Sequence, residues 1–326
     1  MRKFLIGTGI LSVLIAAALW YLSEPDIPRA TLEAKYAIPP SQFVTLPDGA
    51  RVHLRDRGPR DAPALILIHG SNAALFTWEP WAKRLANTFR VVTLDLPGHG
   101  LTGAVPGGDY SQEGMAKFVG EVADALGLQT FAIGGNSMGG RIAVLFAAEH
   151  PGRVTHLILV DSGGVSSKGD RWIVQYGQDF AIRMARLAII NRLLLHVTPR
   201  ALLAAALHRV IVRQEIITDA MIDAYWEFVR MEGTRAATIV RFNARNNGVK
   251  DRLGDIHAPT LILWGEEDHM VPVEIAHEFQ AAIPDSKLII YPHTGHAPQE
   301  EMADASADDV RTFLNGVQAS ARRSKN

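Results

Sequence analysis

TFAIGGNSMGGRIAVLFAAEH, residues 130–150, is the stretch that decides the fold of this 326-residue chain. Its first six residues form an apolar run typical of a strand buried on both faces, and RIAVLFAAEH at 141–150 is typical of a helix. The pentapeptide Gly135-Asn136-Ser137-Met138-Gly139 lies between them, and its glycines allow a sharp turn. A serine on such a strand-to-helix turn is held in an exposed position. The stretch therefore predicts a nucleophilic Ser137, against the competing interpretation of a glycine-rich turn in which the serine only caps the helix.

The same strand signal recurs along the chain. Short apolar runs occupy 64–69, 90–96, 154–161, 260–265 and 287–292, and an alternating pattern around Asp48-Gly49 predicts a hairpin within 43–58. Helix-like segments lie between them, at 78–88, 111–127, 138–149, 273–283 and 302–316. This alternation predicts an α/β fold with a mostly parallel central sheet covered by helices on both faces.

One long segment breaks the alternation. Residues 165–255 contain helical patterns and no buried-strand signal, which predicts a helical cap inserted after the sixth strand. Such an insertion would cover the carboxyl ends of the strands, where open α/β sheets bind ligands. We expect a core of residues 42–164 and 256–318, a cap of residues 165–255, and a polar tail at 319–326.

Composition excludes several kinds of protein. The chain has 33 Lys plus Arg against 34 Asp plus Glu, so it has no net positive charge that would attract nucleic acid. It has no cysteine, which excludes a thiol nucleophile, disulfides and cysteine-based metal sites. We expect a small-molecule substrate and neither a metal nor an organic cofactor. Nothing in the sequence predicts the oligomeric state.

The N-terminus is apolar. Residues 4–22 carry no charge and just reach the length needed to cross a membrane, so residues 1–23 are predicted to form a single-pass transmembrane anchor. With Arg2 and Lys3 on the cytoplasmic side, the remaining chain would lie on the non-cytoplasmic side. The alternative is a cleaved signal and a secreted or periplasmic protein. Residues 24–41 carry four prolines and are predicted to be a linker.

A nucleophilic serine needs a base and a group that orients the base. Asp268 and His296 each follow a predicted strand, downstream of Ser137 and in the order that this architecture uses. We therefore predict these three residues as a catalytic triad. Residues at or near the ends of the same strands are weaker candidates, namely Asp161, Glu266, Glu267, His269 and His293.

A developing oxyanion needs two hydrogen-bond donors. The N–H of Met138 is predicted as one, because it begins the helix after the serine. The loop His69-Gly70-Ser71-Asn72 is predicted to supply the other through Ser71 or Asn72, with His69 fastening the loop. His99 is expected in a structural turn, with Asp95 bonded to loop amides.

Five motifs together resemble one known family. HGSN (69–72), DLPGHG (95–100), GNSMGG (135–140), WGEEDHMVP (264–272) and GHAPQEE (295–301) resemble the α/β-hydrolase superfamily over about residues 42–316. The resemblance implies the fold and the triad, but leaves the reaction open among esterases, lipases, lactonases, perhydrolases and carbon–carbon bond hydrolases. Epoxide hydrolases and haloalkane dehalogenases use an aspartate nucleophile, which Ser137 excludes. GNSMGG resembles the carbon–carbon hydrolases, but those usually carry a tryptophan where this chain has Ala297.

The function expected from these features is hydrolysis of a carboxylic ester with a small to medium hydrophobic acyl or aryl group, through an acyl-enzyme. The competing possibilities are another reaction of the same triad, or a non-enzymatic receptor with a hydrolase pocket. Asn136, Trp172 and Tyr176 are expected to line the pocket. Trp172, Tyr176 and Phe180 share one helical face, although such a face more often packs against a core than lines a pocket.

Overall fold

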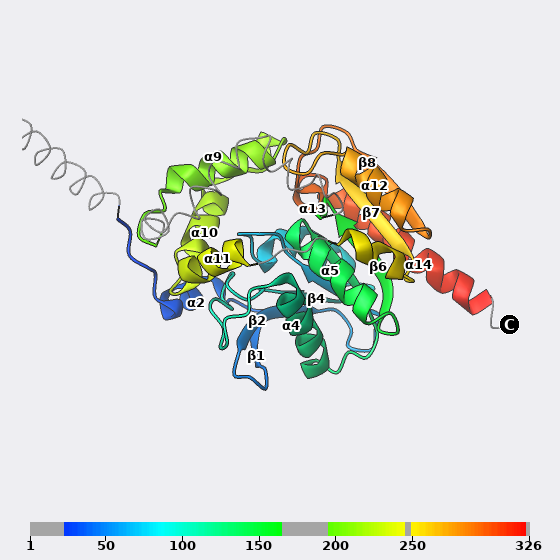
Figure 1. The fold of residues 1–326 in the computed structure, drawn as a ribbon, viewed down its shortest axis with the longest axis horizontal. Helices are drawn as coiled ribbons and strands as arrows, with labels where there is room; N and C mark the ends of the chain where they lie inside the picture. The colour runs from blue at the N-terminus through cyan, green and yellow to red at the C-terminus, as the bar shows by residue number, and fades with distance from the viewer. Residues whose placement is uncertain (1–22, 165–194, 245–248, 324–326) are drawn as a thin grey trace, which may run out of the picture.

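Eight strands form one sheet at the centre of the computed structural model, which describes residues 23–164, 195–244 and 249–323 (Figure 1). The strand order is β1-β2-β4-β3-β5-β6-β7-β8. β1 pairs antiparallel with β2, as does β2 with β4, and all other neighbours are parallel. The predicted mostly parallel sheet is confirmed. The strands are β1 (Ser41–Thr45), β2 (Arg51–Arg57), β3 (Ala64–Ile68), β4 (Arg90–Leu94), β5 (Phe131–Asn136), β6 (Val154–Val160), β7 (Thr260–Gly265) and β8 (Ser286–Tyr291).

Helices cover both faces of this sheet. On one face α4 (Gln112–Ala125), α5 (Met138–Glu149) and α12 (Glu274–Ala282) pack with strand residues such as Ile133 and Ile262. On the other face α3 (Glu79–Leu85) and α14 (Ala303–Arg323) pack against residues such as Leu67 and Leu263. Alternate side chains of β3 to β8 thus enter opposite cores, which explains why these strands appear in the sequence as short apolar runs.

The insertion between β6 and β7 was predicted to be helical, and its described part, residues 195–244, contains helices and no strand. This part contains α9 (Arg200–Val210), α10 (Asp219–Val229) and α11 (Thr234–Asn243). In Figure 1 α10 and α11 lie near α2, and α9 lies above them. The N–H of Val249 donates to the carbonyl of Gly164 at 3.0 Å, so the two ends of the insertion meet. The predicted cap boundary at residue 255 was too late, because Val249, Leu253 and Ile256 are buried in the main core.

The predicted linker at 24–41 was wrong as a description of this segment, because it contains α2 (Arg29–Tyr36). Leu32 is buried beside Phe228 and Met231 of the insertion. Lys35 forms an ion pair with Glu227 at 2.7 Å. The prolines delimit the helix instead of extending the chain, since Pro28 is its N-cap. Arg29 also donates to two carbonyl groups of the core, so this segment packs against both the core and the insertion.

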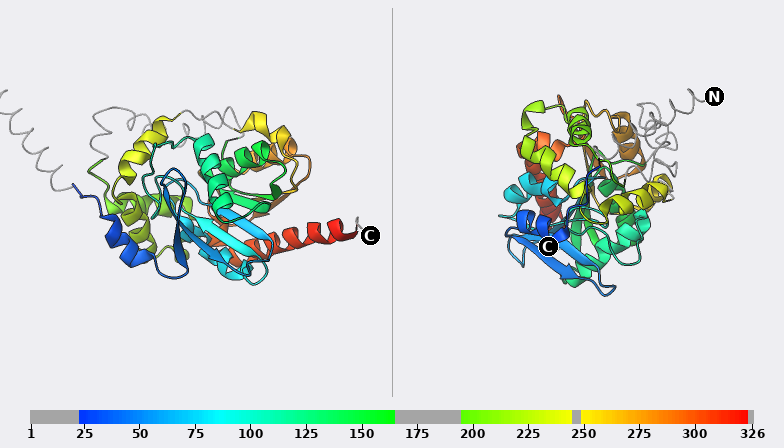
Figure 2. Two further views of the ribbon diagram at one scale, coloured as in Figure 1. Left: turned by 90° about the horizontal axis from the view of Figure 1, so that it is seen from below. Right: turned by 90° about the vertical axis from the view of Figure 1, so that its left-hand side faces the viewer.

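The two ends of the chain differ from the predictions in other respects. α14 continues to Arg323 and extends away from the body (Figure 2), so most of the segment predicted as a polar tail is helical. Across residues 23–164, 195–244 and 249–323, no helix combines the length and the apolar character needed to span a membrane. The predicted anchor falls almost wholly within residues 1–22, which lie outside the described residues. Trp172 and Tyr176, which were predicted to line the pocket, also lie outside the described residues.

Candidate functional site

Ser137 occupies the turn between β5 and α5. Its backbone has φ 55° and ψ −115°, a strained conformation for a residue with a side chain. The turn closes tightly: a Cβ atom on Gly139 would lie 2.2 Å from the Ile68 carbonyl oxygen, and one on Gly135 would lie 2.2 Å from the Gly139 carbonyl carbon. Glycine is therefore required at both positions. The strained backbone presents the serine at the carboxyl end of β5, as the sequence predicts.

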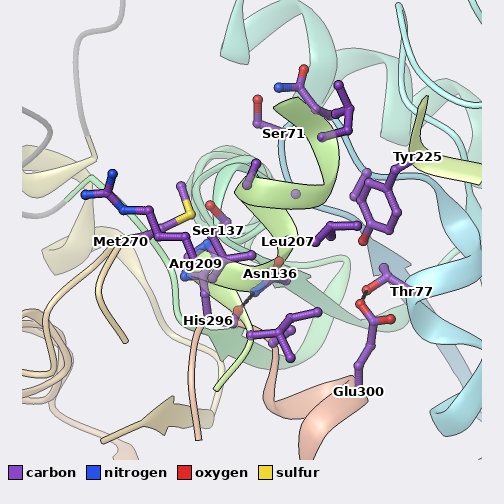
Figure 3. Close-up of a pocket in the computed structure, with 18 of the residues that line it drawn as sticks. Ser71, Thr77, Asn136, Ser137, Leu207, Arg209, Tyr225, Met270, His296 and Glu300 are labelled. Carbon is purple, nitrogen blue, oxygen red and sulfur yellow. Dashed lines mark hydrogen bonds between the residues drawn. The ribbon is translucent and has the colours of Figure 1, made fainter. Parts of the chain in front are cut away.

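Asp268 and His296 meet beside this turn. The Nδ1 atom of His296 is 2.7 Å from Oδ2 of Asp268. The other oxygen of Asp268 accepts backbone N–H groups of Met270, at 2.7 Å, and Val271, at 3.0 Å. An ionised carboxylate held this way fixes the Nδ1–H tautomer, which leaves Nε2 of His296 free to take a proton. His296 and Ser137 line the same cavity (Figure 3).

Asn136 holds this arrangement together. Its Nδ2 group donates to the main-chain carbonyl of His296 at 3.0 Å and to that of Val160 at 3.2 Å. The N–H of His296 in turn donates to the carbonyl of Val210, at the end of α9, at 2.9 Å. Asn136 was predicted to line the pocket, and it does. Its tie between the serine turn and the histidine loop was not predicted, because only the fold brings residues 136 and 296 together.

Asp161, the weaker candidate beside Asp268, lies in the same place. Its Oδ1 atom accepts the N–H of Gly265 at 3.0 Å. Asp161, Asp268 and His296 each have one side-chain oxygen or nitrogen that could bind a metal, and these three atoms lie within 4.8 Å of one another. Burial, and then the charge of Asp268, raise the pKa of Asp161 well above its usual value. The raised pKa favours the protonated form of Asp161, and Asp268 is the carboxyl group that faces His296. The three atoms have the spacing of metal ligands, but a neutral Asp161 and a hydrogen-bonded His296 are poor donors to a cation.

Four further candidates at the strand ends lie apart from the triad. Glu266, His269 and His293 are exposed, and His293 pairs with Glu267 at 3.0 Å. None of these four side chains therefore competes with Asp268 or His296 for the place beside Ser137.

Two residues of the DLPGHG segment have the structural roles predicted for them. His99 is buried and bonds the carbonyl of Pro97 in its own turn. Asp95 accepts N–H groups from Leu75 and Leu101. Both predictions are confirmed.

The predicted oxyanion donors surround Ser137. Met138 is the first residue of α5, so its N–H has no partner within the helix. Ser71 and Asn72 line the cavity with Ser137, and a Cβ atom on Gly70 would lie 3.3 Å from the serine Cβ. Asn72 is itself held by Arg241, which donates to its Oδ1 at 2.7 Å. The first residue of α5 and the loop after β3 therefore both lie next to Ser137, and the two oxyanion donors stay a prediction.

His69 fastens this loop, as predicted. Its Nε2 atom accepts the N–H of Leu96 at 3.0 Å, and its Nδ1 atom lies 2.8 Å from the carbonyl oxygen of Gly70. Burial lowers the pKa of His69, which keeps the ring neutral with one donor and one acceptor.

A cavity of about 450 Å³ opens in front of Ser137 and His296. Much of its described wall is apolar and comes from α9, which supplies Leu202, Leu203, Ala205, Ala206, Leu207 and Val210. The stretch ALLAAALHRV predicts a helix, but nothing in its sequence places that helix over the serine. The small and branched side chains of α9 leave room for an apolar group of the substrate.

One part of the wall is polar, and we call Thr77, Tyr225, Gln299 and Glu300 the polar patch. The Thr77 hydroxyl donates to Oε1 of Glu300 (Figure 3). Nε2 of Gln299 donates to the Thr77 hydroxyl at 3.1 Å. Burial, followed by the charge of Glu301, raises the pKa of Glu300 from 4.5 to about 7, although the Thr77 bond opposes this. The patch was not predicted from the sequence, because its members come from three distant segments.

Glu300 is expected to destabilise the protein at high pH. Because its folded-state pKa of about 7 exceeds the unfolded value, the folded state binds the proton more tightly, and unfolding free energy falls as pH rises from about 4.5 to about 7. Glu300→Gln should therefore raise the unfolding free energy by about 1–3 kcal/mol at pH 8 and by little at pH 4.5. Chemical denaturation at both pH values measures this, with exposed Glu274→Gln as the control. An equal change at both pH values would contradict the raised pKa.

Comparison with known proteins gives a consistent family. Residues 63–303 match the family model described as alpha/beta hydrolase fold. A 2-hydroxy-6-oxo-6-phenylhexa-2,4-dienoate hydrolase of Burkholderia cepacia is 30% identical, over 81% of this chain and 93% of its own length. A 2-hydroxy-6-oxononadienedioate/2-hydroxy-6-oxononatrienedioate hydrolase of Comamonas testosteroni is 28% identical over the same shares.

Among solved structures, one similar chain is described as a membrane phospholipase A, a bacterial virulence factor. It is 27% identical, with a TM-score of 0.74, and the similarity covers 98% of this chain and 99% of that one.

Proposed function

Because the chain belongs to the α/β hydrolase fold family, we propose that it is a serine hydrolase that cleaves carboxylic esters with an apolar acyl chain. Ser137 attacks the ester carbonyl while Nε2 of His296 takes its proton, and Asp268 stabilises the resulting imidazolium. The N–H groups of Met138 and of Ser71 or Asn72 bind the oxyanion. The alcohol leaves with the proton held by His296, and water then releases the acid by the reverse steps.

The observation that carries the choice of ester is the apolar wall that α9 builds opposite Ser137. An acyl chain gains roughly 0.8 kcal/mol for each methylene removed from water, so such a wall favours substrates with an extended apolar part. The similarity to a membrane phospholipase A over almost the entire length of both chains supports an acyl ester.

Hydrolysis of a carbon–carbon bond is the second candidate. The curated relatives named above act on 2-hydroxy-6-oxo-dienoates, according to their names, and share about 28–30% of residues with this chain. Those substrates carry at least one carboxylate, however, and a carboxyl group of Glu300 lines the cavity here. Together with Ala297 after the histidine, this favours the ester.

The two candidates can be separated with a substrate panel. We expect the protein to hydrolyse p-nitrophenyl esters, with kcat/KM rising from acetate to at least hexanoate, and to cleave a 2-hydroxy-6-oxo-6-phenylhexa-2,4-dienoate at least about 100-fold less efficiently. A fluorophosphonate should label the protein once, at Ser137. Faster cleavage of the dienoate than of every ester would reverse the order of the candidates. Neither turnover nor labelling in folded protein would support the non-enzymatic receptor.

We also propose that residues 1–22 anchor the chain to a membrane, with the hydrolase domain on the non-cytoplasmic side. The uncharged apolar run at 4–22 and the two basic residues before it support this. The full chain should stay with the membrane fraction after an alkaline carbonate wash. Release of a product that begins after residue 16 would instead support a cleaved signal.

A further inference from the structure

The polar patch lies at one side of the cavity, away from Arg209 and Met270 in the view of Figure 3. The α9 wall of the same cavity is mostly apolar. Thr77 and Gln299 are 2% and 1% exposed, so the patch is built into the fold. Apolar walls of this kind usually contain few polar groups, and those that are present fix the orientation of a ligand. Neither the proposed acyl transfer nor the hydrogen bonds that hold His296 use this patch.

The hydrogen bonds within the patch leave acceptors unused. The one hydroxyl hydrogen of Thr77 goes to Glu300, so Gln299 must present its NH₂ group to Thr77 and turn its Oε1 atom away. That Oε1 atom is buried and has no hydrogen-bond partner in the part of the chain that the structure describes. Thr77 is likewise the one donor that reaches the Glu300 carboxylate among the described residues. A buried acceptor without a donor is costly, so a bound group that donates a hydrogen bond would be favoured here.

Tyr225 adds a donor to these acceptors. Its ring contacts Phe76 edge-on, which fixes its position, and its hydroxyl interacts with Thr77 and with the charge of Glu300. Burial raises the pKa of Tyr225 well above its ordinary value, so the hydroxyl stays protonated. An alcohol group, which both donates and accepts, matches a carboxylate acceptor beside a phenol donor.

We propose that the polar patch is a subsite for an uncharged hydroxyl group of the substrate, and that Glu300 selects against substrates with a carboxylate at the same position. The proposal rests on ester hydrolysis as the proposed function and names the class of ester: one that carries a hydroxyl group beyond its apolar part. The hydroxyl can belong to the acyl chain or to the alcohol. In either case it binds between Glu300 and Tyr225.

The charges at the patch favour a neutral group over an anion. Within the polar patch the ionisable groups are the Glu300 carboxyl and the protonated Tyr225, and the carboxylate of Glu301 lies behind them and bonds backbone N–H groups. An ionised Glu300 would repel a substrate carboxylate across a low-dielectric cavity. A neutral hydroxyl meets no such repulsion.

Three esters with the same acyl length test the proposal at pH 8. They are p-nitrophenyl hexanoate, 6-hydroxyhexanoate and hydrogen adipate, which end in a methyl, a hydroxyl and a carboxylate. For the alcohol side, glyceryl monohexanoate is compared with propyl hexanoate. We expect kcat/KM for one hydroxylated ester to exceed that of its unsubstituted partner by about 10–100-fold, as for a hydrogen bond to a charged group. The pair that shows the preference identifies which part of the substrate carries the hydroxyl.

Two variants of Glu300 separate hydrogen bonding from charge. Glu300→Leu should reduce the hydroxyl preference to less than about threefold, because the acceptor is gone. Glu300→Gln keeps an acceptor and should retain part of the preference, while raising kcat/KM for hydrogen adipate relative to hexanoate by about tenfold as the repulsion disappears. Glu274→Gln, on an exposed position of α12, should leave all ratios as they are.

The ratios also keep this proposal distinct from the proposed function. If the wild-type protein hydrolyses hexanoate but shows no preference for either hydroxylated ester, the subsite is wrong and the ester hydrolase stands. An unchanged preference in folded Glu300→Leu would overturn the role of Glu300. If no ester is hydrolysed at all, the proposed function itself fails, and with it this proposal.

Discussion

Replacing Ser137 by alanine is expected to lower kcat/KM for p-nitrophenyl hexanoate by about 10⁴-fold or more, the scale seen when a serine hydrolase loses its nucleophile. The oxyanion donors and the cavity would remain, so a small residual rate above that in water is expected. The measurement is steady-state hydrolysis, together with loss of fluorophosphonate labelling.

The matched control for this prediction is Ser162→Ala. Ser162 is buried and packs closely against Gly140, which lies one helical turn after Ser137. The Ser162→Ala variant should still be labelled by the fluorophosphonate, and its activity should fall by less than about tenfold. More than about 1% residual activity in Ser137→Ala would show that another group attacks the ester.

The second large effect is expected at Asp268, and it should contrast with Asp161. Asp268→Asn should lower kcat by roughly 10³–10⁴-fold, because the amide no longer holds His296 in the tautomer that accepts the serine proton. Asp161→Asn should lower it by less than about tenfold. An amide presents one donor towards Asp268, as a protonated carboxyl does, and its oxygen can still accept the N–H of Gly265.

Steady-state kinetics of the two asparagine variants, with circular dichroism to verify folding, gives the comparison. Similar losses in both would mean that the two carboxyl groups share the charge that orients His296. A larger loss in Asp161→Asn would show that Asp161, and not Asp268, is the carboxyl group that orients His296.

The central sheet and the serine turn could be predicted from sequence because their signals are local. Strands buried on both faces are short apolar runs, and Gly135 and Gly139 flank Ser137 in a pattern that the sequence shows directly. The close approach that requires glycine at 135 is also local, whereas Gly139 is limited by the carbonyl of Ile68 on β3. Asp268 and His296 were also predictable, since the ends of parallel strands meet at one edge of a sheet. The predicted triad is supported by its geometry, because His296 bonds Asp268 and lines one cavity with Ser137.

Other features depend on contacts between distant segments. Glu300 and Glu301 are neighbours in sequence, yet Glu301 accepts the N–H groups of Val212, Arg213 and Gly295 whereas Glu300 faces the cavity. No local pattern separates them, because the difference arises from where α9 ends. Asp161 and Asp268 are likewise equivalent acids at strand ends. The fold distinguishes them: Asp268 accepts the N–H groups of Met270 and Val271 and faces His296, whereas burial raises the pKa of Asp161.

The packing of α2 has a practical consequence for any shortened form of the protein. A product that began at residue 41, where the sheet begins, would remove Leu32 from its contacts with Phe228 and Met231 and leave Glu227 without Lys35. The insertion that carries α9 would then lose part of its support, although every strand was intact. Residues 23–41 thus form a folded segment that supports the insertion, and they are not a flexible linker. Whatever residues 1–22 attach to is therefore connected to the substrate cavity through folded protein.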